Sequence, residues 1–353
     1  MTTESLLVYL NGDEKSAQEI INQSNNFAGV EKTSLGTVRI QKFSDNEVCI
    51  DFLSSVRGKR VYILSSPNSS DEIMKLNLAI DAAKRGAASE IIPILPYFPY
   101  ARQDKKDQSR GPIGAKVVAE MLEQRGSTSV ITFDLHADQI QGFFNIPVTH
   151  IEGKNVFDDY IATNLIGGAT VLCGPDAGSG KRVKRMQKQI QSHYNVNLNY
   201  VMMDKTRTEA NKVDEMVIIG DVKGKNVIIL DDLIDTAGTL CMAASVLKNA
   251  GAIEVNAVIS HGVLSGPALE RIGKSDLNSL IISNSLPIDT DTKLPKQSAF
   301  VSRNDSDKYN AAKDGLKKIL VISVASQIGF AMAAINNHMS YEALKAKHEE
   351  EQK

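Results

Sequence analysis

The sequence predicts an α/β protein in which helices cover mainly parallel β-sheets. Short apolar runs that suit buried strands recur along the chain, at residues 6–10, 60–65, 90–97, 129–135, 169–175, 226–232 and 254–262. Helical patterns lie between them, at residues 71–86, 114–126, 180–194 and 238–251. Several of these patterns end in glycine, as helices commonly do. Strands that alternate with helices form βαβ units, whose strands run parallel.

The length and rhythm of the chain predict two domains. With 353 residues the chain exceeds what one core comfortably organises. Each half contains a strand followed by an Asp-containing turn, FDLHAD in the first and LDDLIDTAG in the second. We expect a first domain at 1–155 that is completed by 323–345, a second domain at 156–322, and a charged tail at 346–353. The apolar segment from Ile319 changes period partway, which indicates a strand that continues into a buried helix.

Composition excludes several classes of partner. The net charge is only −2, so bulk electrostatics indicate neither nucleic acid nor an anionic membrane as a partner. The N-terminus carries acids and too short an apolar run for a signal peptide. Cys49, Cys173 and Cys241 are scattered without metal-ligand spacing, which is typical of reduced thiols and implies no zinc site. We therefore expect a cytoplasmic location.

The stretch VIILDDLIDTAGTL (227–240) carries the strongest chemical signal. Asp231 and Asp232 fall at the carboxyl end of a predicted parallel strand, where ligands of open α/β sheets bind. Buried carboxylates are costly unless paired, so these two should face a ligand or a cation. The acids suit sugar hydroxyls, and the loop that follows suits a phosphate at a helix start. We expect a ribose phosphate to be bound by the pair and by Asp235, Thr236, Ala237, Gly238 and Thr239. The simpler alternative is a helix cap followed by an ordinary turn.

Four further stretches narrow the family. They are PYFPYARQDKKDQSR (96–110), FDLHADQIQGFF (133–144), KTRTEANKVDEMVIIGDVKGK (205–225) and SHGVLSGPA (260–268). With the double-Asp motif they resemble ribose-phosphate pyrophosphokinases of the phosphate-dependent class, in register over nearly the whole chain. The resemblance implies two phosphoribosyltransferase-like domains, each a mainly parallel sheet flanked by helices. ATP would bind the first and ribose phosphate the second, in a homohexamer built from dimers.

Two stretches of the first half suit ATP. Arg102 and Gln103 follow a strand and an aromatic turn, and their planar donors fit nucleotide phosphates and base. A solvated charged loop remains the alternative. On the strand-like run 41–52, an exposed Phe43 flanked by acids could stack on adenine; otherwise Phe43 is core. The resemblance implies an ATP site completed by a neighbouring subunit and made of Phe43, Asp45, Glu47, Arg102, Gln103 and Asp104.

The resemblance also implies metal-binding and catalytic residues. His136 directly follows a strand end, where an imidazole can ligate Mg²⁺ or touch a phosphate, although a lone histidine is more often structural. The resemblance implies Mg²⁺ as cofactor, with His136, Asp134 and Asp176 as its candidate ligands and Asp176 beside the sugar. The charged stretch 205–216 lacks an apolar period, so we expect an exposed loop. Its Lys205 and Arg207, together with His136, are the implied catalytic residues.

The implied reaction is Mg²⁺-dependent transfer of the β,γ-diphosphoryl group of ATP to the anomeric 1-hydroxyl of ribose 5-phosphate, which gives phosphoribosyl pyrophosphate and AMP. Ser179, Asn145 and Thr149 depart from the family pattern. These departures leave open whether phosphate and ADP regulate the enzyme, and whether the acceptor is a larger molecule such as ADP-ribose. A non-catalytic, synthetase-associated regulatory subunit is the alternative from another class, and the presence of the three catalytic candidates argues against it. A phosphoribosyltransferase that consumes the product would lack YARQDKK.

Overall fold

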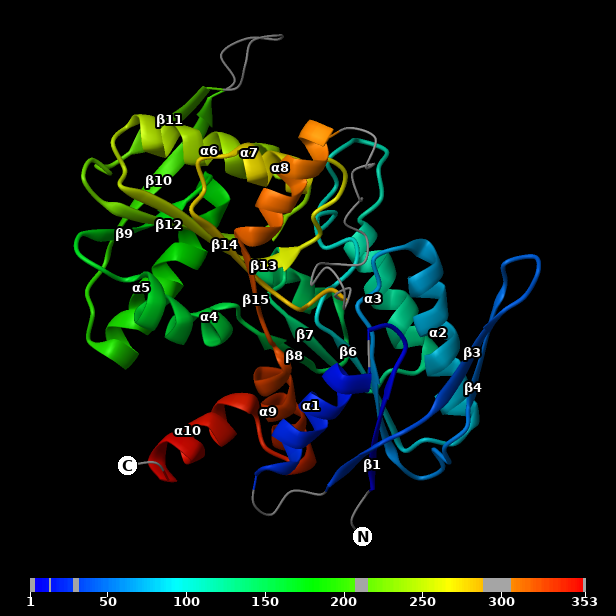
Figure 1. Cartoon of the computed structure of the whole chain (residues 1–353). Helices are drawn as coiled ribbons and strands as arrows, with labels where there is room; N and C mark the ends of the chain where they lie inside the picture. Colours follow the sequence, from blue (N-terminus) through cyan, green and yellow to red (C-terminus); the bar gives the residue numbers. More distant parts are fainter. Residues whose placement is uncertain (1–3, 13, 28–31, 207–214, 288–305, 352–353) are drawn as a thin grey trace. The chain divides into compact units, whose positions relative to one another are not determined.

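The computed structural model describes residues 4–12, 14–27, 32–206, 215–287 and 306–351. The chain forms two compact units (Figure 1). Unit 1 contains Met1–Glu152 and Val324–Lys353, and unit 2 contains Gly153–Ser323. The chain therefore leaves the first unit, builds the second, and returns to the first near its end.

Unit 1 contains a six-stranded sheet in the order β2-β1-β5-β6-β7-β8, in which every neighbouring pair is parallel. Its strands are β1 Ser5–Tyr9, β2 Thr33–Leu35, β5 Arg60–Leu64, β6 Glu90–Leu95, β7 Val130–Phe133 and β8 Val148–Ile151. All five residues of β5 are buried. Helices cover both faces of the sheet, which explains why its central strands are continuous apolar runs rather than alternating ones.

The helices of unit 1 form two groups. Helices α2 and α3 pack together, and their apolar residues join those of the strands in one core. Helices α1 and α9 form the second group, although they come from opposite ends of the chain; Figure 1 shows them side by side in blue and dark red. The bounds are α1 Glu14–Asn25, α2 Ser70–Arg85, α3 Gly114–Arg125, η1 Asp138–Phe143, α9 Ala325–Asn336 and α10 Tyr341–Glu351.

A buried polar hub attaches the returning helix α9 to unit 1. The Oδ1 atom of Asn336 accepts hydrogen bonds from Ser5 Oγ at 3.1 Å, Arg60 Nη1 at 3.0 Å and Tyr62 OH at 2.7 Å. Its Nδ2 atom donates to Thr33 Oγ1 at 3.2 Å. Because buried donors require acceptors, this side chain fixes the returning helix α9 to strands β1, β2 and β5.

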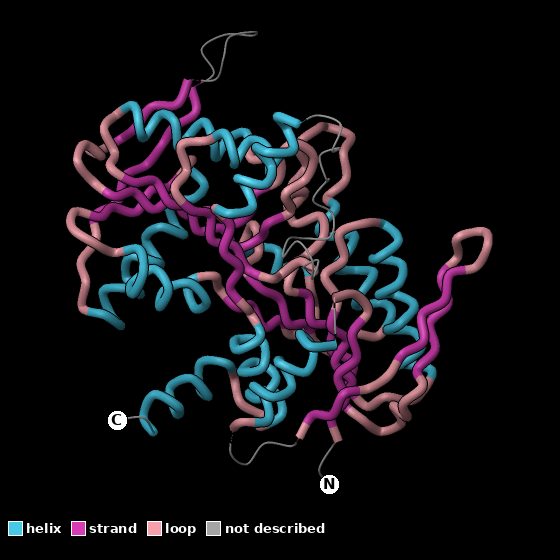
Figure 2. The backbone as a smooth tube through the Cα atoms, viewed as in Figure 1, coloured by secondary structure: helices cyan, strands magenta, loops and turns pink. Residues whose placement is uncertain are grey.

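A two-stranded antiparallel hairpin completes unit 1. Strands β3 (Val38–Lys42) and β4 (Val48–Phe52) pair from Val38 opposite Phe52 to Lys42 opposite Val48. The tube in Figure 2 shows the hairpin projecting beyond the sheet and helices of its unit. The base of β4 packs against α2, whereas the tip is exposed.

Unit 2 contains a seven-stranded sheet in the order β11-β10-β9-β12-β13-β14-β15. Its pairs are parallel except β10 with β11, which are antiparallel. The strands are β9 Thr170–Gly174, β10 Asn199–Thr206, β11 Glu215–Ile219, β12 Asn226–Ile234, β13 Glu254–Gly262, β14 Ser279–Ser283 and β15 Ile319–Ile322.

The apolar core of unit 2 lies between this sheet and three helices, α6, α7 and α8. Helices α4 and α5 pack against each other, and α5 also contacts β9, β10 and β12. The bounds are α4 Lys154–Tyr160, η2 Ile161–Leu165, η3 Ala177–Ser179, α5 Gly180–Tyr194, α6 Gly238–Asn249, α7 Ala268–Lys274 and α8 Ser306–Lys317. Helices α7 and α8 approach closely because Gly273 on one faces Gly315 on the other.

The predicted fold class is confirmed, and the four predicted helices correspond to α2, α3, α5 and α6. The segment from Ile319 is strand β15 followed by helix α9, as its change of period indicated. Strands β2, β8, β10, β11 and β14 were not predicted, because their apolar runs are short or interrupted by polar residues. Within the described residues, no helix combines the length and hydropathy that crossing a membrane would require.

Candidate functional site

The acidic pair lies near the carboxyl end of β12. This strand continues to Ile234, two residues beyond the end that its sequence indicated, so two further strand residues separate the acidic pair from the loop. The backbone N–H of Asp232 donates to Asp231 Oδ1 at 2.9 Å, and Asp232 is buried. Burial, followed by the negative charge of Asp232, raises the pKa of Asp231 well above its ordinary value. A bound cation, or hydroxyl groups that donate hydrogen bonds to the carboxylates, would stabilise the ionised form of the pair.

Asp176 adds a third carboxylate to the same region. It follows β9, the parallel neighbour of β12, and its charge contributes to raising the pKa of Asp231. Asp176 is exposed, and its Oδ1 accepts a 2.9 Å hydrogen bond from the N–H of Ser179. The Ser179 hydroxyl in turn accepts from the Asp176 N–H at 3.4 Å and donates to the Asp176 carbonyl at 2.6 Å. The hydroxyl that departs from the family pattern therefore closes a capping box around this aspartate.

The segment that follows the acidic pair, residues 235–239, is called the amide loop below. Its Thr236 and Thr239 are exposed, and helix α6 begins at Gly238. Ala237 precedes the helix with a φ of 61°, a left-handed conformation that a residue other than glycine rarely adopts. The N-terminal end of α6 and the two threonine hydroxyls thus meet at the surface. This arrangement suits an anion, because a helix N-terminus presents backbone donors and a positive dipole end.

The segment after β13 holds the amide loop from one side. The N–H groups of Val263 and Leu264 donate to the carbonyl of Ile234 at 2.9 and 3.2 Å, and the Ser265 hydroxyl donates to Asp235. These supporting residues were missed by sequence reasoning, which used SHGVLSGPA only as a family feature. The available signal was topological, because loops that leave neighbouring parallel strands meet at one sheet edge.

In unit 1, the structure brings together the turns that follow β6 and β7. Arg102 and Gln103 are exposed in the first turn, and His136 is exposed in the second. Gln139 of the second turn donates to Asp104 of the first at 2.9 Å, which joins the two segments. Adjacent parallel strands explain the meeting of residues more than 30 positions apart in sequence.

The three expected metal ligands are divided between the two units. Asp134 is buried with a φ of 43°, and its N–H donates to the Ile151 carbonyl at 2.7 Å, whereas His136 two residues later is exposed. Asp176 belongs to unit 2. Across the described ranges, no group of three or more His, Cys, Asp or Glu side chains could hold a metal ion. Mg²⁺ commonly needs only one or two carboxylates when substrate phosphates supply other ligands, so the residues present still fit that ion.

The tip of the β3–β4 hairpin corrects one expectation. Residues 43–47 form a turn rather than a continuing strand, with the Phe43 N–H donating to the Glu47 carbonyl at 2.8 Å. The Glu47 N–H also donates to Asp45 Oδ1 at 3.1 Å. The alternation in this stretch belongs to the two flanking strands. Phe43 is 54% exposed, so it is not a core residue of its own chain.

The charged stretch 205–216 is also partly strand. Lys205 pairs with Met216 and Thr206 with Glu215, so both ends belong to the β10–β11 hairpin. An edge hairpin needs no continuous apolar face, which is why its charged sequence indicated a loop instead. Arg207 lies outside the described residues.

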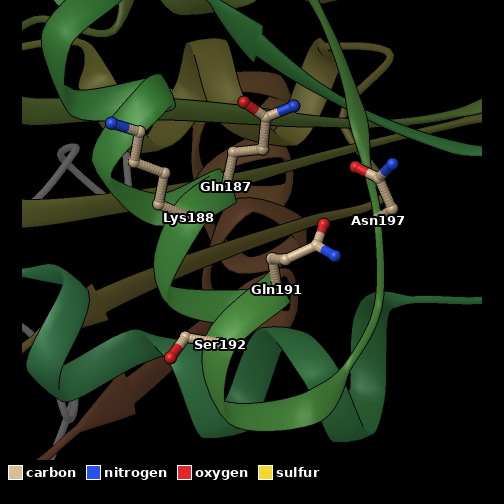
Figure 3. A pocket seen from close by; sticks show the side chains of 5 residues that line it. All are labelled: Gln187, Lys188, Gln191, Ser192 and Asn197. Carbon is tan, nitrogen blue, oxygen red and sulfur yellow. The ribbon is translucent and has the colours of Figure 1, made fainter.

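Two hollows lie elsewhere on the surface. One of about 270 Å³ lies beside the second half of α5 and is lined by Gln187, Lys188, Gln191, Ser192 and Asn197 (Figure 3). The other, of about 390 Å³, lies in unit 1 between β4, the loop after it and the end of α2. Neither is lined by any of the predicted site residues.

Known proteins that are similar to this chain in sequence and structure point to one family. Residues 6–126 match the N-terminal domain of ribose phosphate pyrophosphokinase, and residues 179–299 match the phosphoribosyl synthetase-associated domain. A ribose-phosphate pyrophosphokinase from Helicobacter hepaticus is 46% identical over 267 residues, which cover 75% of this chain and 84% of the relative. One from Caldanaerobacter subterraneus is 40% identical over 83% of this chain and 90% of the relative. The crystal structure of phosphoribosylpyrophosphate synthetase from Mycobacterium smegmatis matches with a TM-score of 0.79 and 30% identity, and covers 95% of this chain and 100% of that one.

Two phosphoribosyltransferase-like α/β units, one with an acidic pair before an amide loop, define the class of protein. Relatives of 40–46% identity define the family within that class. The chain belongs to the ribose-phosphate pyrophosphokinase family, and is therefore an enzyme, a diphosphotransferase. The predicted resemblance is confirmed.

Proposed function

We propose that this enzyme transfers the β,γ-diphosphoryl group of ATP to the anomeric hydroxyl of ribose 5-phosphate, with Mg²⁺, and releases AMP. The observation that carries the proposal is the acidic pair of β12 directly before the amide loop of α6. Carboxylates accept hydrogen bonds from sugar hydroxyls, and a helix start binds phosphate. The names of the relatives agree with this reaction.

The acceptor binds in unit 2. Asp231, Asp232 and Asp176 take the ribose hydroxyls, and the 5-phosphate binds to the amide loop. The raised pKa of Asp231 supports this assignment, because a buried acidic pair without a cation is unfavourable and gains from donors brought by a ligand. The exposed hydroxyls of Thr236 and Thr239 supply further donors to the phosphate.

ATP binds in unit 1, for which we propose the boundaries 1–155 and 323–345. Arg102, Gln103 and Asp104 lie in the turn after β6, beside the turn that carries His136. The exposed hairpin tip with Phe43, Asp45 and Glu47 supplies adenine contacts to a neighbouring copy. An aromatic ring that is 54% exposed at the end of a projecting hairpin gains from such a partner. The proposal therefore includes self-association, as a homohexamer built from dimers.

The reaction displaces AMP from the β-phosphorus. The anomeric oxygen forms a bond to that phosphorus, the bond to the oxygen between the α- and β-phosphorus breaks so that AMP leaves with that oxygen, and the hydroxyl proton is released to solvent. Lys205, Arg207 and His136 balance the negative charge that accumulates on the transferred group. Asp176, His136 and Asp134 are the residues that would hold Mg²⁺, which would supply further charge neutralisation to the phosphates. The free thiols Cys49, Cys173 and Cys241 support a reducing, cytoplasmic location.

An acceptor panel tests the proposal. The full chain is incubated with ATP and Mg²⁺, and AMP release is measured with ribose 5-phosphate, ADP-ribose or no acceptor. We expect AMP and phosphoribosyl pyrophosphate to form in equal amounts with ribose 5-phosphate, and chelation of Mg²⁺ to stop both. Faster turnover with ADP-ribose would identify ADP-ribose as the acceptor instead. An absence of AMP with every acceptor would refute the proposed reaction.

A further inference from the structure

Arg271 of helix α7 lies directly over the amide loop. Its Nη1 donates to the carbonyl oxygen of Thr236 at 2.9 Å. A Cβ atom placed on Gly238 would lie 3.3 Å from the same nitrogen, so the guanidinium borders the first residue of α6. Ala237, between these two contacts, has the left-handed φ of 61°. One exposed arginine thus holds the peptide that enters the helix.

This contact determines the direction of a backbone donor. A trans peptide is planar, so the Thr236 carbonyl and the Ala237 N–H point in opposite directions. With its carbonyl held by Arg271, the peptide must direct the Ala237 N–H away from α7. Rotation of the peptide would exchange the two groups and place a carbonyl oxygen where a phosphate would meet an N–H. The left-handed conformation of Ala237 is unfavourable by itself, and requires such contacts to persist.

The charges around Arg271 also favour an anion. Its guanidinium lies beside the N-terminal end of α6, which carries a partial positive charge. In the part of the chain that the structure describes, no carboxylate forms an ion pair with Arg271. The adjacent Glu270 pairs with Lys274 at 2.7 Å instead. Two positive features therefore converge on one surface, and a bound phosphate would stabilise both.

We propose that Arg271 is a positioning residue for the acceptor phosphate: it locks the 236–237 peptide so that the amide loop presents donors rather than a carbonyl oxygen. This inference rests on the proposed function, because it assumes that the loop binds the 5-phosphate of the acceptor. It adds a residue from outside the loop, on a helix that contributes nothing else to the site. The effect should concern acceptor binding and leave ATP binding unchanged.

Three variants of the full chain test the inference by steady-state kinetics. Arg271→Met removes both donor and charge, Arg271→Lys keeps a charged donor, and Lys274→Met removes a charge from the same helix without touching the loop. We expect Arg271→Met to raise KM for ribose 5-phosphate by about 10- to 100-fold, the range for loss of a charged hydrogen bond. KM for ATP should stay within about 2-fold, since the contact concerns the acceptor loop alone. Arg271→Lys should recover most of the loss, and Lys274→Met should resemble the wild type.

The outcomes separate this inference from the proposed reaction. If the wild type turns over ribose 5-phosphate but Arg271→Met keeps its KM, Arg271 has no positioning role and the reaction stands. An equal rise in KM for ATP, or the same rise in Lys274→Met, would also overturn the inference. If the wild type releases no AMP, the reaction itself is wrong. Should Arg271→Met not fold, Arg271→Gln, which is shorter and uncharged, takes its place with the same expectation.

Discussion

The backbone N–H of Asp232 donates a 2.9 Å hydrogen bond to Oδ1 of Asp231, the residue before it. This bond favours the ionised form of Asp231, but burial and the nearby charge of Asp232 outweigh it and raise the pKa. The strand therefore holds two acids in an arrangement that opposes folding when both are ionised. The acidic pair therefore lowers the stability of the folded protein at the site where we propose that the ribose binds. Such a loss is common at functional sites.

Asp231→Asn should stabilise the protein near pH 7 and strongly reduce its activity. Because the folded-state pKa lies above the ordinary value of 3.8, the wild type loses stability as pH rises from that value through the folded pKa. Asparagine removes this loss, so the gain in Tm should be present at pH 7 and vanish near pH 3.8. Activity should fall at least about 100-fold, as when a preorganised polar group is removed. Thermal unfolding across pH and AMP release measure the two effects.

Asp221→Asn is the matched control for this pH dependence. A hydrogen bond from Lys225 lowers the pKa of Asp221, which is the opposite direction. Its contribution to stability is therefore present above the ordinary value and lost as pH falls through the folded pKa. Its replacement should give no gain in Tm at pH 7. A gain of equal size in both variants would show that general surface charge, rather than the acidic pair, is responsible.

Lys205→Ala should reduce kcat by about 100-fold or more while the Tm changes little. The proposed role of this lysine is to balance charge that appears only in the transition state, so kcat and kcat/KM should fall together. The backbone of residue 205 remains paired with Met216 in the β10–β11 hairpin whatever its side chain. Lys223→Ala, an exposed lysine elsewhere in unit 2, serves as control. Turnover near the wild-type value in Lys205→Ala would remove this lysine from the mechanism.

Gly273→Ala should destabilise unit 2 and weaken acceptor binding. A Cβ atom at this position would overlap the carbonyl oxygen of Ala311 on α8, so the two helices must move apart. Overpacking of this kind costs about 1–3 kcal/mol, which lowers the Tm by a few degrees. Because α7 also carries Arg271, KM for ribose 5-phosphate should rise as well.

Gly167→Ala is the control for that exchange. Apart from Gly167 itself and its two chain neighbours, no atom of the described structure lies within 4 Å of the added Cβ, and the residue has no positive φ. The free energy of unfolding should change by no more than about 0.5 kcal/mol. If Gly273→Ala unfolds at the same temperature as Gly167→Ala, the close contact of α7 with α8 is not required.

Asn336→Leu should cost at least about 3 kcal/mol of unfolding free energy, because it removes the shared acceptor of three buried donors. Asn336→Asp keeps an acceptor beside the guanidinium of Arg60, and should cost clearly less. Urea unfolding of the two variants measures the difference. Equal losses would indicate that the shape of the side chain, rather than its acceptor, anchors α9.

Much of the fold followed from local sequence. The helices α2, α3, α5 and α6 and the apolar strands β5, β9 and β12 each carry a periodicity or a continuous apolar run that their burial demands. The acidic pair and the amide loop were identified because two adjacent acids at the end of an apolar run have few structural uses. The edge hairpin β10–β11 was missed, because strands at an edge are not required to bury both faces.

The sequence by itself determined the fold class, the family and the place of the acidic pair before the amide loop, since each depends on residues close together in the chain. Tertiary structure alone decided that Arg271 holds the Thr236 carbonyl, that Ser265 meets Asp235, and that Asn336 joins strands some 300 positions away. Such pairs depend on the order of strands in a sheet and on how helices pack. No local pattern records that order, because it results from the burial of the whole core.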